Sequence, residues 1–147
     1  MIKAKKSLGQ NFLVDQNIIE KILNIIEIKD ENILEVGPGT GNLTYEIQRK
    51  KPKKIIVIEK DKTLVDLLKD KFESKIEIIN EDILKIKEEK LINEKLIVFG
   101  NLPYNISTEI LCKWILNTKE NPWFKYLILM FQKEVADRIM AKFNTKN

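Results

Sequence analysis

The feature that most restricts the fold of this chain is a regular alternation of two kinds of segment. Five short, mostly apolar runs are separated by longer stretches, most of which carry apolar residues every three or four positions. Short apolar runs indicate strands buried on both faces, and the longer spacing indicates amphipathic helices. The expected strands lie at 33–36, 55–58, 76–79, 96–99 and 126–131. Their alternation with helices predicts an α/β fold built on an open parallel sheet.

The expected helices fill most of the intervals between these runs. They lie at 15–26, 43–50, 63–72, 107–116 and 133–141. Asp15 begins the first of them and can accept hydrogen bonds from the backbone N–H groups of its first turn. A chain of 147 residues is long enough for one such domain and too short for two of average size.

The composition excludes several kinds of chemistry. The chain contains no histidine, so every mechanism that needs an imidazole is excluded. The single cysteine, Cys112, cannot form an internal disulfide, and no cluster of cysteine and histidine exists to hold zinc. No apolar run is long enough to span a bilayer, and the N-terminus lacks the apolar core of a signal peptide. We therefore expect a cytoplasmic protein without a metal site or a membrane segment.

The net charge of +4 favours a polyanionic partner. The richness in Lys, Ile and Asn gives a second explanation, the base composition of the genome, and the sequence does not decide between them. The cluster of Lys3, Lys5 and Lys6 is more specific, because it lies on an N-terminal arm apart from the acidic residues. These lysines are candidates for phosphate contacts, or else belong to a solvated tail. The sequence specifies no oligomeric state, and a monomer is the working expectation.

Four polar or glycine-rich segments directly follow four of the predicted strands. They are 37–41, 59–61, 81–82 and 101–105. Because ligands of open parallel sheets bind at the carboxyl ends of the strands, these segments are expected to converge on one binding site.

The first two segments indicate a nucleoside ligand. Gly37, Gly39 and Gly41 allow a tight turn and a close approach of the backbone to a ligand. Glu59 follows roughly 20 residues later, the distance at which an acidic side chain reaches ribose hydroxyls in nucleotide-binding folds. Asn42 stands where the dinucleotide pattern has its last glycine, which argues against NAD. The alternative for Glu59 is a cap of the following helix.

The other two segments offer groups that suit a purine. Asp82 can accept a hydrogen bond from an exocyclic amine, or it can cap the segment after it. Asn101 can accept and donate hydrogen bonds, Pro103 leaves neighbouring carbonyls free, and Tyr104 offers a face on which a base can stack. Taken alone, this set is equally consistent with a turn and a core tyrosine.

Six motifs, in order along the chain, carry a resemblance to a known family. They are LGQNFLVDQNII from Leu8, EVGPGTGNLT from Glu35, VIEKD from Val57, NEDIL from Asn80, VFGNLPYNIST from Val98 and FQKEVADR from Phe131. The sequence resembles the ribosomal RNA adenine dimethyltransferases, which use S-adenosylmethionine to dimethylate N6 of two adjacent adenosines near the 3' end of small-subunit ribosomal RNA. The resemblance implies a Rossmann-like class I methyltransferase sheet with helices on both faces. It also implies S-adenosylmethionine as cofactor and the immature small ribosomal subunit as partner.

The resemblance further implies a set of cofactor contacts. Asn11 and Leu13, with Gln10 and Phe12 near them, are expected to close over the methionine end of the cofactor. The other expected contacts are Gly37 at the methionine and ribose, Glu59 at the ribose hydroxyls, Asp82 with Ile83 at the adenine, and Asn101 toward the methyl group.

The residues expected at the target adenine are Asn101, Leu102, Pro103 and Tyr104. The Asn101 oxygen and the Leu102 carbonyl are candidates to accept the two hydrogens of the target amine. Tyr104 is expected to stack on the flipped base. Lys3, Lys5 and Lys6 become candidates for RNA binding.

The family pattern also extends beyond this chain. Members continue with two more strands and a small helical domain, so we expect the chain to be the front part of a longer protein. We expect residues 1–14 to form a basic arm and cofactor-closing segment, and residues 15–147 an incomplete methyltransferase domain. Two alternatives stay open: an adenine N6-methyltransferase acting on large-subunit ribosomal RNA or another nucleic acid, and a non-catalytic RNA-binding or ribosome assembly factor.

Overall fold

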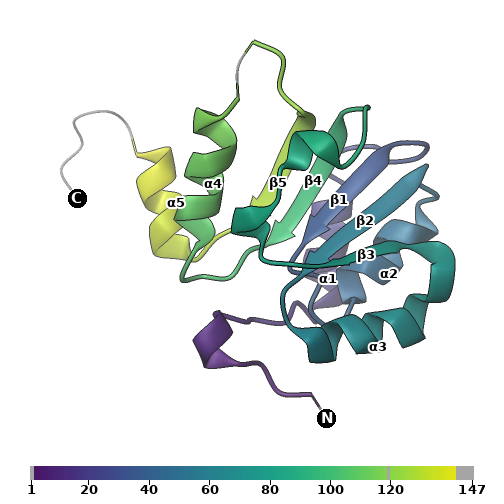
Figure 1. The fold of residues 1–147 in the computed structure, drawn as a ribbon. Coiled ribbons are helices and arrows are strands. Elements are labelled where there is room, and N and C mark those ends of the chain that lie inside the picture. Colours follow the sequence, from purple (N-terminus) through teal and green to yellow (C-terminus); the bar gives the residue numbers. More distant parts are fainter. Residues whose placement is uncertain (1, 119, 142–147) are drawn as a thin grey trace.

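The computed structural model describes residues 2–118 and 120–141, which form a five-stranded parallel sheet with helices on both faces (Figure 1). The strands are β1 (Asn32–Val36), β2 (Lys54–Glu59), β3 (Glu77–Asn80), β4 (Leu96–Asn101) and β5 (Phe124–Met130). Their order across the sheet is β3-β2-β1-β4-β5, and every neighbouring pair is parallel. The predicted α/β fold is confirmed.

The helices lie close to the predicted ranges. They are α1 (Gln16–Leu23), α2 (Asn42–Arg49), α3 (Lys62–Phe72), α4 (Ser107–Leu116) and α5 (Lys133–Met140). Four short 3-10 turns accompany them: η1 (Lys6–Leu8), η2 (Glu73–Lys75), η3 (Ile83–Lys85) and η4 (Glu88–Lys90). Asp15 caps α1 as expected, since its Oδ1 accepts hydrogen bonds from the N–H groups of Asn17 and Ile18. None of the helices in the described ranges is long and apolar enough to cross a membrane.

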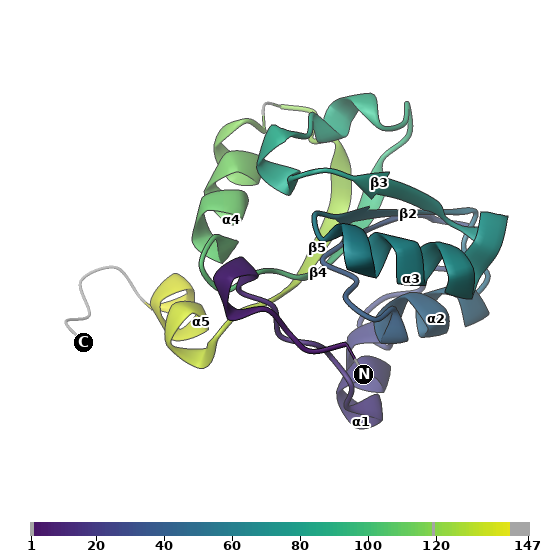
Figure 2. The ribbon, with the colours of Figure 1, turned by 60° about the horizontal axis from the view of Figure 1, so that its bottom comes forward.

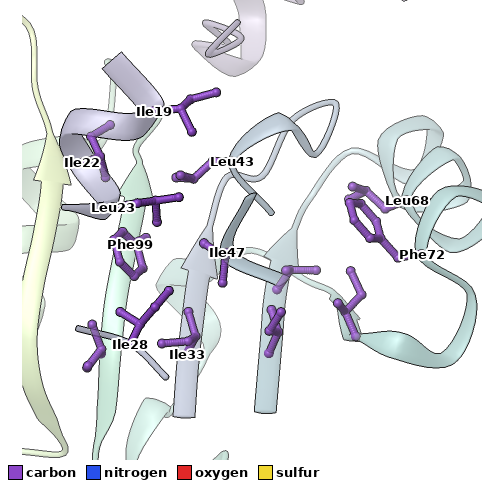
Figure 3. Close-up of a cluster of buried hydrophobic side chains, with 14 residues drawn as sticks. Ile19, Ile22, Leu23, Ile28, Ile33, Leu43, Ile47, Leu68, Phe72 and Phe99 are labelled. Atoms are coloured by element: carbon purple, nitrogen blue, oxygen red, sulfur yellow. The ribbon is translucent and has the colours of Figure 1, made fainter. Parts of the chain in front are cut away.

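Two apolar clusters fix α1, α2, α3 and α4 to the two faces of the sheet. Neighbouring residues of β1 point to different faces, so Ile33 belongs to one cluster and Leu34 to the other. The first cluster, shown in Figure 3, joins the sheet to α1, α2 and α3. The second joins it to η3 and to α4, whose Trp114 is fully buried. The carboxyl ends of the strands are thereby held in one rigid frame.

The central and the edge strands differ in burial. β1, β2 and β4 are almost wholly buried, as the apolar runs predict. The expectation that all five strands are buried on both faces is wrong for β3 and β5, which are half-buried to exposed. Each of these strands has a partner on one side only, and Tyr126 of β5 is 53% exposed. In the described residues the outer edge of β5 has no neighbouring strand.

A buried carboxyl group ties β1 to α2 beneath the glycine-rich turn. Glu35 is 1% exposed, and Thr44 of α2 donates a hydrogen bond from Oγ1 to its Oε2 at 2.6 Å. Burial raises the pKa of Glu35 to about 7, because the charged form loses its hydration. The 37–41 turn therefore connects β1 and α2, which are also joined by the hydrogen bond to the Glu35 carboxyl group, whose pKa lies near neutral pH.

Glu35 should make stability depend on pH. In the unfolded chain the carboxyl ionises near 4.5, whereas in the folded chain it keeps its proton up to about 7. The free energy of unfolding should therefore fall as pH rises from about 4.5 to about 7, and then level off, by at most roughly 3 kcal/mol. In Glu35→Gln this fall should largely disappear in denaturant unfolding measured at pH 5 and pH 8.

Glu20→Gln is the matched control, because Glu20 is exposed on α1. This variant should keep the pH dependence of the wild type. Equal pH dependence in Glu35→Gln and the wild type would contradict the assignment.

Candidate functional site

A cavity of about 300 Å³ lies at the carboxyl ends of β1, β2, β3 and β4. All four segments singled out in the sequence contribute to its wall, through Gly37, Glu59, Asp82 and Asn101. Residues 7–12 of the N-terminal segment close it on another side. Figure 1 shows this segment at the arrowhead end of the sheet. The predicted convergence of the four strand ends on one cavity is therefore present.

Gly37 is required by its backbone conformation and by its neighbour. Its φ is +70°, and a Cβ atom there would lie 2.6 Å from the carbonyl oxygen of Asn101. The absence of a side chain thus lets the end of β1 approach the end of β4. Gly39 has a φ of +58° and faces the ring of Phe12 from the N-terminal segment. The turn brings backbone, rather than side chains, to the cavity.

Glu59 lies at the end of β2 with its carboxylate held by backbone. Its side chain is 8% exposed, and its Oε1 accepts a hydrogen bond from the N–H of Asp61 at 2.8 Å. Burial raises the pKa of Glu59, although hydrogen bonds from the N–H groups of Asp61, Gly39 and Lys60 oppose that effect. The alternative that Glu59 caps α3 is wrong, because the cap is Asp61, whose Oδ1 accepts from Thr63 N.

Asp82 borders the cavity and also caps the turn that follows it. Its Oδ1 accepts a hydrogen bond from Leu84 N at 3.0 Å, so the capping alternative is confirmed. Its Oδ2 accepts one from Lys60 Nζ at 2.8 Å, and this bond holds the pKa of Asp82 below its usual range. Ile83 lies beside it in the cavity wall. Each carboxylate oxygen thus has one hydrogen-bond donor and can accept a further hydrogen bond, which leaves the proposed purine contact possible.

Lys60 was missed by the sequence reasoning. It follows Glu59 directly, so its position in the strand-end segment 59–61 was the available signal. It lines the cavity, and its Nζ lies 2.8 Å from Asp82 Oδ2.

The segment after β4 divides between the cavity and its surroundings. Asn101 and Pro103 line the cavity, whereas Leu102 is buried in the second apolar cluster. Tyr104 is 45% exposed, so the alternative of a core tyrosine is wrong. Its hydroxyl donates a hydrogen bond to the carbonyl of Lys6 at 3.2 Å. Tyr104 is not one of the residues that line the cavity, and its hydroxyl contact places it beside the N-terminal segment.

The N-terminal segment reaches the cavity through Gln10, Asn11 and Phe12. The carbonyl of Asn11 accepts a hydrogen bond from Asn101 Nδ2 at 2.5 Å. Leu13 does not line the cavity, because its side chain packs against the first apolar cluster. In the same segment Lys5 forms an ion pair with Asp61 at 2.7 Å.

The family model for ribosomal RNA adenine dimethylase matches residues 1–147. The chain belongs to this family. The ribosomal RNA small subunit methyltransferase A of Pelagibacter ubique is 62% identical over 146 residues, which are 99% of this chain and 56% of that protein. The chain thus spans about half the length of the relatives it matches.

Two solved structures resemble this dimethylase-family chain in fold. A dimethyladenosine transferase from Plasmodium falciparum matches with a TM-score of 0.76 and 31% identity, over 90% of this chain and 47% of the other. The 23S ribosomal RNA methyltransferase ErmE matches with a TM-score of 0.72 and 30% identity, over 86% of this chain and 50% of the other. The sheet and its helices are therefore those of the methyltransferase fold that the motifs imply.

The wall of the cavity fits S-adenosylmethionine, the cofactor implied by the family. Gly37 leaves space for close backbone contact, and Glu59 offers a carboxylate to a ribose diol. Asp82 and Ile83 supply a polar and an apolar group next to each other, as an adenine ring requires. In the described residues no group of three or more His, Cys, Asp or Glu is placed to hold a metal ion.

Replacing Glu59 should weaken cofactor binding. Loss of a charged acceptor for two hydroxyl groups corresponds to about 1.5 to 3 kcal/mol, so Glu59→Ala should raise the Kd for S-adenosylmethionine about tenfold or more. Isothermal titration calorimetry measures this change. Asp66→Ala, an exposed position on α3, serves as control and should leave the Kd within about twofold. An unchanged Kd in Glu59→Ala would remove Glu59 from the cofactor site.

Proposed function

We propose that this chain carries the catalytic site of an S-adenosylmethionine-dependent enzyme that dimethylates N6 of two adjacent adenosines near the 3' end of 16S ribosomal RNA and contributes to small-subunit maturation. The observation that carries the proposal is the hydrogen bond from Asn101 Nδ2 to the Asn11 carbonyl, at the wall of the cavity. The name of the 62% identical relative supports the small subunit as target.

The hydrogen bond to Asn11 determines which atom of the Asn101 amide is left for a substrate. Because Nδ2 donates to a carbonyl, Oδ1 is the atom available to accept from the target amine. The Leu102 carbonyl is the proposed second acceptor, next to Pro103, whose ring fixes the backbone. Two acceptors on the two hydrogens of N6 would draw its lone pair out of conjugation with the ring.

The chemistry needs alignment more than charge neutralisation. Bound S-adenosylmethionine supplies a methyl group on a positively charged sulfur. Asn101 has no useful proton affinity near neutral pH, so it orients the amine and does not act as a general base. The apolar and backbone groups around Gly37 and Phe12 exclude water from the meeting point of the two reactants. The proton leaves for water after transfer, when the methylated nitrogen is strongly acidic.

Tyr104 is proposed to hold the flipped adenine. Tyr104 is 45% exposed, follows Pro103 of the cavity wall, and donates a hydrogen bond from its hydroxyl to the carbonyl of Lys6. Stacking on such a ring contributes about 1 to 3 kcal/mol per base, which offsets part of the cost of unstacking the base from RNA.

The same proposal assigns roles along the whole chain. Residues 1–14 would act as basic arm and cofactor-closing segment, and residues 15–147 as the methyltransferase domain, of which 142–147 lie outside the described residues. Asn11, Gly37, Glu59, Asp82 and Asn101 remain the proposed cofactor contacts, whereas Leu13 lies outside the cavity wall and packs against the first apolar cluster. The protein would act as a monomer in the cytoplasm, and its partner would be the immature small ribosomal subunit.

The 30% identical ErmE structure favours one second candidate, methylation of adenine in large-subunit RNA. A non-catalytic RNA-binding or assembly role is the third. Transfer of labelled methyl groups to undermethylated small subunits, large subunits and DNA separates these functions. The proposal expects label in N6,N6-dimethyladenosine of the small subunit alone. Label in the large subunit supports the second candidate, and RNA binding without label supports the third.

Replacing Asn101 should separate turnover from cofactor binding. Asn101→Ala removes the acceptor for the target amine and one bond to the N-terminal segment. We predict that turnover is nearly abolished while the Kd for S-adenosylmethionine rises by no more than about tenfold, which is roughly 1.4 kcal/mol. Asn24→Ala, an exposed position after α1, should change neither. Abolished cofactor binding in calorimetry would refute this division of labour.

The basic arm should contribute to the salt dependence of RNA binding. Lys3, Lys5 and Lys6 are proposed phosphate contacts, with Lys5 the weakest because its ammonium lies 2.7 Å from Asp61. Replacing Lys3 and Lys6 by Met should reduce the slope of log K against log salt by about 1 to 2. The control is Lys21→Met with Lys29→Met, outside the arm. An equal slope in both pairs of variants would leave the arm a solvated tail.

A further inference from the structure

Residues 5–12, the N-terminal strap, are attached to both walls of the cavity. On the α3 side, Lys5 Nζ and Gln10 Nε2 both reach Asp61 Oδ2, at 2.7 and 3.0 Å. The backbone N–H of Lys5 donates to Gln10 Oε1 at 2.7 Å, so the two strap residues hold each other as they hold Asp61. Lys5, Gln10 and Asp61 thus form a closed hydrogen-bond network at this wall.

On the β4 side the strap uses backbone carbonyls. Tyr104 N donates to the carbonyl of Gly9 at 3.4 Å, next to the bond between Asn101 and Asn11. Gly9 has a φ of +63°, and a Cβ atom there would lie 2.5 Å from Asn105 Oδ1. In Figure 2 the purple η1 lies beside the start of α4, in agreement with these contacts. The strap therefore spans the cavity from α3 to the turn after β4.

Asp61 connects the strap to the predicted ribose site. Its N–H donates to Glu59 Oε1 at 2.8 Å, its Oδ1 caps α3 through Thr63 N at 3.0 Å, and its Oδ2 receives the strap. The residue is only 7% exposed. A carboxylate buried to this extent needs partners, and two of them, Lys5 and Gln10, come from the strap.

We propose that Asp61 is a positioning residue that latches the N-terminal strap over the cavity, so that closing the strap and ordering the ligand at Glu59 and Asn101 are one coupled event. Burial raises the pKa of Asp61, but the hydrogen bonds from Lys5, Gln10 and Thr63 outweigh this effect and keep the carboxyl ionised. The latch slows ligand escape, because the strap must leave Asp61 before a ligand can leave the cavity. Only the identity of the ligand rests on the proposed function.

Asp61→Asn tests the latch with little disturbance of the helix. The new side chain can keep an oxygen toward Thr63, whereas its NH₂ group faces the donors of Lys5 and Gln10. Asp15→Asn is the matched control, since Asp15 caps α1 in the same way and forms no hydrogen bond or ion pair with the strap within the described residues. Asparagine is an equally good cap residue, so the two variants should have similar melting temperatures.

The first readout needs no ligand. Hydrogen exchange followed by mass spectrometry should show exchange in residues 5–12 at least about tenfold faster in Asp61→Asn and in Lys5→Met, and unchanged in Asp15→Asn and Lys21→Met. Lys5→Arg keeps the cation and should behave as the wild type. The double variant of Lys5→Met and Asp61→Asn should exchange no faster than Asp61→Asn alone, because Asp61→Asn already removes the partner of Lys5.

The second readout is the rate at which S-adenosylmethionine leaves the chain. This dissociation rate should rise about five- to tenfold in Asp61→Asn and in Lys5→Met, with a smaller change in the association rate. Unchanged exchange of the strap in Asp61→Asn, or additive effects in the double variant, would overturn the proposal. If the wild type fails to bind S-adenosylmethionine, the proposed function fails, while the exchange measurement still decides the latch.

Discussion

The parallel pairing of β1 with β2 on one side and with β4 on the other is the constraint on which the rest of the structure depends. It places the strand order reversal next to β1, where open α/β sheets bind their ligands. It also brings the ends of β1 and β4 so close that Gly37 has no room for a side chain beside the Asn101 carbonyl. The strand ends that carry Gly37 and Asn101, which we propose to face the cofactor and the target adenine, are therefore neighbours in the sheet.

The fold was predictable because burial dominates it. Apolar runs such as 96–99 are long enough to identify strands, and Asp15 marks the start of a helix by a local hydrogen bond. The burial of β3 and β5 was predicted wrongly, because an apolar run does not reveal which strand lies at an edge. The mixed burial of these strands follows from strand order, a property of the whole chain rather than of any segment.

The site was predictable only where it follows the strand ends. Glu59 and Asn101 were predicted to lie at the site because each lies just past the end of an apolar run. The partnership of Asp61 with Lys5 was not, since the two are far apart in sequence and meet only when the strap folds back over the cavity. The ion pair of Lys60 with Asp82 Oδ2 was also not predicted, because these two residues are distant in sequence. Long-range polar contacts carry no periodic signal.

The central claim is that the strand ends and the strap together form the cofactor site. Backbone amide chemical shifts, followed by NMR during titration with S-adenosylmethionine, test it most directly. The account predicts that the largest shifts lie in 37–41, 59–61, 81–84 and 101–105, together with residues 7–12 of the strap. Saturable binding with its largest shifts elsewhere, for example in the loop around η4 and the end of α4, would contradict it.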